Sequence, residues 1–63
     1  MAEREAHIET DSGRHVATIR LDERDVPDGL QRAAQNWLSA DGWDRDTWPD
    51  FKVRSGRYEM RAA

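Results

Sequence analysis

The chain has 63 residues, no cysteine, 10 basic and 13 acidic side chains, and 37% hydrophobic residues. This length is below that of typical multi-domain proteins, and without cysteine there can be no disulfides and no thiolate metal sites. The chain has no run of the roughly 20 apolar residues that a transmembrane helix needs, and no apolar secretory signal near its start. We therefore expect a single domain over residues 1–63, in the cytoplasm and without a membrane partner.

Alternation of apolar and polar side chains over residues 4–21 predicts a β-hairpin. Ser12-Gly13 at its centre indicates a two-residue turn in which the glycine supplies a positive φ. With this turn Glu5 faces Arg20 as an opposite-charge pair, which supports the register. The expected polar face carries Glu5, His7, Glu9, Asp11, Arg14, Val16, Thr18 and Arg20. The expected apolar face carries Ala6, Ile8, Thr10, His15, Ala17, Ile19 and Leu21.

Apolar side chains recur at helical spacing after this hairpin and predict a helix over residues 26–41. Pro27 suits the first turn of a helix, and Asp25 or Asp28 is a suitable N-cap. The apolar stripe of the helix consists of Val26, Leu30, Ala33, Ala34, Trp37 and Leu38.

Residues 42–50 are expected to form a connecting loop. Gly42 fits the C′ position of a Schellman motif, in which Trp43 at C″ packs on Leu38. Trp48 has two interpretations. It is either a lid over the seam between helix and sheet, or an exposed aromatic anchor for a partner.

A second alternating segment over residues 51–61 predicts another hairpin, with Ser55-Gly56 at its tip. The element order is then ββαββ. It predicts a small α+β domain in which one helix packs on one face of a four-stranded antiparallel sheet. The turn sets the expected cross-strand pairs Phe51–Met60, Lys52–Glu59 and Val53–Tyr58. The expected core is Ile8, Ile19, Leu21, Leu30, Ala34, Trp37, Leu38, Phe51, Val53 and Tyr58.

The sequence suggests no catalytic or metal-binding constellation. His7 and His15 are expected on opposite sheet faces, so no Ser–His–acid arrangement is indicated. The aspartates after the helix superficially resemble a calcium loop, but Trp48 and Pro49 stand where that loop needs an oxygen ligand and a glycine. We therefore expect a non-enzymatic protein without cofactors, catalytic residues or metal ligands.

Acidic residues flank both ends of the predicted helix, and the second group surrounds a tryptophan. Tryptophan is enriched among the residues that dominate interface energies, and carboxylates steer association toward a basic partner. This pattern predicts a protein-binding surface formed by Asp22, Glu23, Asp25, Asp44, Asp46, Trp48 and Asp50. In size, acidity and expected layout, the chain resembles small phage-encoded inhibitors such as anti-CRISPR and anti-restriction proteins. The resemblance implies inhibition of a nucleic-acid-handling protein at its basic groove.

Two alternatives remain open from the sequence. A basic hairpin could bind nucleic-acid phosphates, through Lys52, Arg54, Arg57 and Arg61. Alternatively, the chain could be a small accessory subunit or a homodimer that associates through the polar sheet face around Val16.

Overall fold

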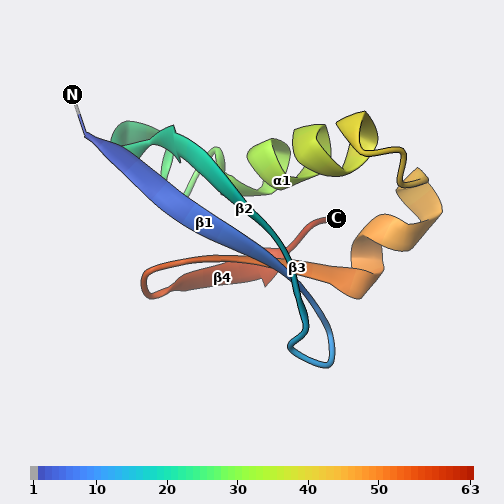
Figure 1. Ribbon diagram of the computed structural model, residues 1–63. Coiled ribbons are helices and arrows are strands. Elements are labelled where there is room, and N and C mark those ends of the chain that lie inside the picture. The colour runs from blue at the N-terminus through green and yellow to red at the C-terminus, as the bar shows by residue number, and fades with distance from the viewer. Residues whose placement is uncertain (1) are drawn as a thin grey trace.

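The computed structural model describes residues 2–63 and contains a four-stranded antiparallel sheet with one α-helix packed against one face (Figure 1). This confirms the predicted α+β class and the ββαββ order. The strands are β1 (Glu3–Thr10), β2 (His15–Asp22), β3 (Phe51–Ser55) and β4 (Tyr58–Arg61). The helical segments are η1 (Glu23–Asp25), α1 (Leu30–Ala40) and η2 (Arg45–Asp50), of which η1 and η2 are 3₁₀-helices. The strand order β2-β1-β3-β4 shows that the two hairpins meet through β1 and β3.

The first hairpin keeps the predicted register along most of its length, but its turn is different. Glu5 pairs with Arg20 as expected. At the tip, the Thr10 backbone N–H donates to the Arg14 carbonyl and the Gly13 N–H donates to the Thr10 carbonyl, both at 2.9 Å. The loop therefore has three residues, with Gly13 at φ +89°. A two-residue turn would require a positive φ at its first central residue, Ser12. The three-residue loop instead has the positive φ at Gly13, where glycine adopts it without steric cost.

A β-bulge in β2 corrects the predicted faces of this hairpin. Ile8 pairs with Ala17, whereas the next residue of β1, Glu9, pairs with His15, so Val16 is the extra residue. The bulge reverses the alternation beyond it. His15 therefore joins His7 on the open sheet face, contrary to the prediction of opposite faces, and Val16 packs against the core. The open face is thus not centred on Val16.

The second hairpin is shifted by two residues from the predicted register. Ser55 pairs with Tyr58, so the central turn residues are Gly56 and Arg57. Gly56 has φ +58°, and no residue other than glycine has a positive φ in the described chain. This is the pattern of a type II′ turn, which places glycine at the first central position. Because a two-residue shift conserves the side-chain faces, Val53 still lies on the core side.

Helix α1 begins four residues later than predicted. Val26 precedes Pro27 and is extended, with φ −106° and ψ 128°, as the steric effect of a following proline favours. The chain then turns, and Gly29 is the N-cap, without a side-chain cap hydrogen bond. Thus neither predicted aspartate caps the helix. A Cβ on Gly29 would lie 3.0 Å from the Asp25 carbonyl oxygen, so this close turn favours glycine.

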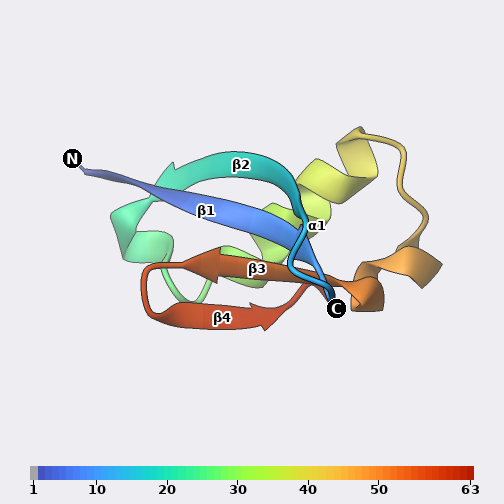
Figure 2. The same cartoon turned by 60° about the horizontal axis from the view of Figure 1, so that its bottom comes forward.

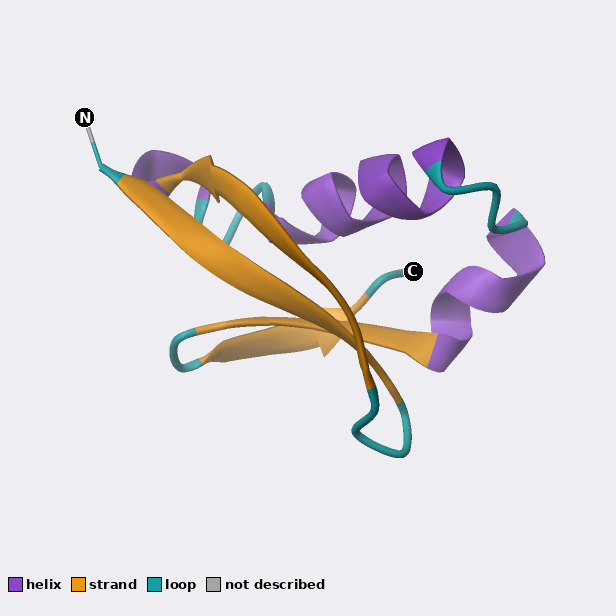
Figure 3. Ribbon diagram, in the orientation of Figure 1, coloured by secondary structure: helices purple, strands orange, loops and turns teal. Residues whose placement is uncertain are grey.

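The other end of α1 confirms the Schellman motif. Gly42 has φ +90°. The Trp43 N–H donates to the Leu38 carbonyl at 2.9 Å, and the Gly42 N–H donates to the Ser39 carbonyl at 3.1 Å. These bonds satisfy carbonyl groups that the end of the helix leaves unpaired. The expected loop 42–50 is partly helical, because η2 occupies most of it (Figure 3).

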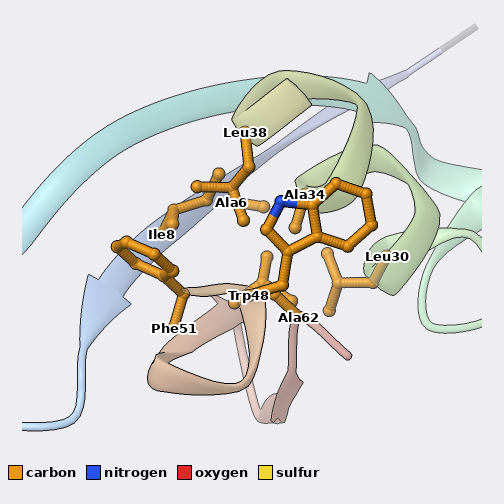
Figure 4. Packing of buried hydrophobic residues seen from close by; sticks show 9 residues of the cluster. Ala6, Ile8, Leu30, Ala34, Leu38, Trp48, Phe51 and Ala62 are labelled. Carbon is orange, nitrogen blue, oxygen red and sulfur yellow. The ribbon is translucent and has the colours of Figure 1, made fainter. Parts of the chain in front are cut away.

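The core lies between α1 and the sheet and includes three residues that the predicted core omitted, Ala6, Trp48 and Ala62. Trp48 has the largest side chain of the three. Its side chain is 8% exposed, and its indole lies among residues from the helix and the sheet (Figure 4). The buried residues are Ala6, Ile8, Leu30, Ala34, Leu38, Trp48, Phe51, Val53 and Ala62. Four predicted core residues are partly buried and pack against this cluster: Ile19, Leu21, Trp37 and Tyr58. Small side chains thus leave room for the indole.

Candidate functional site

The acidic residues before α1 have local structural roles. Asp22 caps η1, because its Oδ1 accepts from the Arg24 backbone N–H at 2.9 Å and from Arg24 Nε at 3.3 Å. Glu23 Oε1 lies 3.4 Å from Arg4 Nη2. Asp25 stands in the first turn of η1, where a negative charge is favourable. These three predicted site residues therefore contribute to the local structure at this end of the chain.

The two predicted acidic clusters do not form one surface. The first cluster lies at η1 and the second at η2, and Figure 1 shows these segments beyond opposite ends of α1. An 11-residue helix is about 16 Å long. The structure therefore divides the predicted binding surface between two ends of the molecule.

Trp48 is not an exposed anchor. It is buried between α1 and the sheet, which agrees with the interpretation of a residue at the helix–sheet seam. The exposed tryptophan is Trp43, with 40% of its surface accessible, the highest exposure of a large hydrophobic residue in the described chain. The sequence predicted only a packing role for Trp43. Its exposure could not be predicted, because a Schellman motif specifies the backbone at C″ but not how much of the side chain the sheet covers.

The Trp43 side chain is held in place by two neighbours. Its indole Nε1 donates to Asp41 Oδ2 at 3.1 Å. Its ring meets Phe51 edge-on, with the ring centroids 5.0 Å apart and the planes at 70°, a favourable aromatic geometry. The ring is therefore fixed in orientation while much of its surface remains open to a partner.

Carboxylates surround this tryptophan in sequence. Asp44, Asp46 and Asp50 are exposed, and none forms an ion pair with another residue in the described range. The nearby base Arg45 lies over the Trp48 ring at 5.4 Å. We call Asp41, Trp43, Asp44, Asp46 and Asp50 the Trp43 patch. It combines one fixed aromatic surface with an excess of negative charge.

The predicted basic hairpin is partly neutralised. Arg54 Nη2 donates to Glu9 Oε2 at 2.8 Å, and Arg61 Nη1 forms an ion pair with Asp11 Oδ1. The other two predicted bases, Lys52 and Arg57, form no ion pair with a described residue. The structure therefore reduces the free positive charge of this hairpin.

The ion pair on the open sheet face lowers the pKa of Glu9 below its ordinary 4.5. The main cause is the hydrogen bond from Arg54, and the positive charges of Arg54, Lys52 and His7 act in the same direction against desolvation. The same hydrogen bond raises the pKa of Arg54. The ionised pair is thus favoured in the folded state.

This pKa shift predicts a loss of stability in acid. Because the pKa of Glu9 is lower in the folded state, ionised Glu9 contributes its full stabilisation of the fold above pH 4.5. This contribution disappears as the pH falls through the folded-state pKa of Glu9. We expect Glu9→Gln to have a smaller decrease in melting temperature than the wild type between about pH 7 and about pH 3. Glu3→Gln is the control, because Glu3 lies 3.9 Å from Arg20 in an exposed pair. An equal effect of both variants would contradict the assignment.

His7, Thr18 and His15 form a small cluster on the open sheet face. Thr18 Oγ1 lies 2.9 Å from His15 Nε2 and 3.2 Å from His7 Nδ1, and the imidazole centroids are 5.9 Å apart. His7 and Thr18 are directly paired across β1 and β2, as the register predicted, and the bulge brings His15 to the same face, which simple alternation could not predict. No group of three His, Asp or Glu side chains within residues 2–63 is placed to hold a metal ion.

Comparisons with known proteins add no relationship. No protein-family model matches the chain, and neither the curated proteins nor the solved structures contain a significant match. In the part of the chain that the structure describes, no helix has the length and apolar character to cross a membrane.

Proposed function

We propose that this chain is a non-enzymatic protein-binding module that contacts a basic partner through the Trp43 patch. The observation that carries the proposal is the exposed but oriented ring of Trp43, held by Asp41 and Phe51. A side chain already fixed in its orientation loses less conformational freedom on binding. Tryptophan is also frequent among the few residues that dominate binding energies.

The surrounding charges support a basic partner. The exposed carboxylates of Asp44, Asp46 and Asp50 would attract arginine or lysine side chains and would repel phosphates. We propose a partner with a basic nucleic-acid-binding groove, which the module would inhibit by occupying it. A cytoplasmic location is part of the proposal, since small secreted domains are usually rich in disulfides and this chain has no cysteine.

Nucleic-acid binding by the basic hairpin is less well supported. Arg54 and Arg61 already have carboxylate partners. The open sheet face has no exposed large aromatic side chain in the described residues, although proteins that bind single strands commonly stack bases on aromatic rings. This alternative predicts a binding affinity that falls steeply as the salt concentration rises.

The proposal is tested by capture from host lysate with and without nuclease, followed by affinity measurement with the captured protein. We expect a partner that survives nuclease. Trp43→Ala should weaken its binding by about 2 kcal/mol or more, and Asp44→Lys with Asp46→Lys should weaken it further through repulsion.

The matched control is Asp25→Lys with Asp28→Lys, which changes the net charge equally at the other end of α1. We expect it to leave the affinity nearly unchanged. Equal binding by the Asp44/Asp46 variant and the wild type would overturn the proposal. Recovery of nucleic acid alone, lost in Lys52→Ala with Arg57→Ala, would support the basic hairpin instead.

A further inference from the structure

A pocket of about 480 Å³ lies at the end of the molecule opposite η2, and no function has yet been assigned to it. Figure 2 shows η1 and the turn between β3 and β4 at this same end. The lining residues are Arg4, Glu23, Val26, Arg57 and Tyr58. The volume falls within the range of about 300–1,000 Å³ that small-molecule sites span.

The late start of α1 leaves space for this pocket. Because the helix begins only at Leu30, it does not cover the beginning of β1. Arg4 lies on the same face of β1 as the buried Ala6, since strand side chains alternate with a period of two. The second hairpin turn comes close to it, because a Cβ on Gly56 would lie 3.5 Å from Arg4 Nη1. Residues more than 50 positions apart in the sequence thus line one pocket.

The pocket carries an excess of positive charge. The Arg57 guanidinium lies 5.5 Å from the Tyr58 ring centroid and forms no ion pair with a residue of the described chain. Arg4 contacts Glu23 at 3.4 Å, but both side chains are about half exposed, and such pairs are weak. The pocket thus has two guanidinium groups but only one carboxylate, which contacts Arg4, and both guanidinium groups retain N–H donors for an anion.

We propose that this pocket binds a small organic phosphate, with the phosphate group between Arg4 and Arg57. Guanidinium groups match phosphate oxygens in geometry and charge. A phosphate monoester carries close to two negative charges at neutral pH and so engages both arginines. A ligand carboxylate carries only one negative charge, and Arg4 already has the carboxylate of Glu23 beside it. The remaining volume accommodates the organic part. This site is independent of the Trp43 patch.

The test is a titration of the ¹⁵N-labelled protein with AMP, inorganic phosphate and acetate, followed by NMR. We expect AMP to shift the backbone amides of Glu23, Gly56 and Arg57 most, inorganic phosphate to shift them less, and acetate to leave them in place. Arg57→Ala and Arg4→Ala should each weaken AMP binding by about tenfold or more, as for loss of a charge-assisted hydrogen bond. Unchanged peak dispersion in these exposed-residue variants shows that the fold is retained.

Arg14→Ala is the control, because Arg14 is exposed at the tip of the other hairpin and has no ion pair with a described residue. It should bind AMP like the wild type. The proposal is overturned if all three arginine variants weaken binding equally. It is also overturned if acetate shifts the same amides as AMP, or if AMP above about 1 mM, which corresponds to only about 4 kcal/mol of binding free energy, shifts none of them.

Discussion

Trp48→Ala is expected to lower the free energy of unfolding by about 3–5 kcal/mol, the loss typical of removing a buried aromatic side chain. Trp48 is 8% exposed, and the indole fills the space that Ala34 and Ala62 leave beside it (Figure 4). A domain of this size has little stability to lose, because it buries only about 60% of its unfolded surface. Urea denaturation followed by circular dichroism measures the change.

Two further variants distinguish cavity formation from other effects of this substitution. Trp48→Phe keeps an aromatic ring and removes the indole Nε1, which is buried without a hydrogen-bond partner, so we expect a smaller loss than for alanine. Trp37→Ala should also cost less than Trp48→Ala, because Trp37 is only partly buried. A larger loss for Trp37→Ala than for Trp48→Ala would contradict the packing described above.

Leu38→Ala is expected to lower the free energy of unfolding by about 2–5 kcal/mol. Leu38 is fully buried and projects from the last turns of α1 toward Ala6 and Ile8 of the central strand β1 (Figure 4). Alanine preserves the backbone carbonyl that accepts from the Trp43 N–H. The Schellman motif therefore stays intact, and the variant reports the packing of helix on sheet. Chemical denaturation gives the change directly.

Ser39→Ala is the matched control, one position along the same helix. Ser39 is exposed, and surface substitutions of this kind usually change stability by less than about 0.5 kcal/mol. Alanine is also the better helix former. Equal losses for Leu38→Ala and Ser39→Ala would show that the substitutions act on the helix itself and would contradict the role of Leu38 in the core.

The candidate site shows how far the sequence predicted function. Aspartates next to two tryptophans were visible in the sequence, and the structure leaves Asp44, Asp46 and Asp50 exposed in and beside η2. The sequence did not show which of the two tryptophans is exposed, because Trp43 and Trp48 both lie in the same acidic segment with few other apolar residues. Their burial depends on how η2 folds back against α1 and the sheet. Similarly, nothing in the sequence indicated that Arg54 and Arg61 would meet Glu9 and Asp11 from the other hairpin.

The sequence by itself determined the order of strands and helix, the Schellman motif at Gly42 that follows α1, and the core face of most strand residues. These features follow from local periodicity and from glycine conformation, which neighbouring residues specify. Tertiary structure decided the pairing of β1 with β3, the burial of Trp48 and the pocket at Arg4 and Arg57. Each of these depends on contacts between residues distant in sequence, whose free energy arises only when both segments fold together.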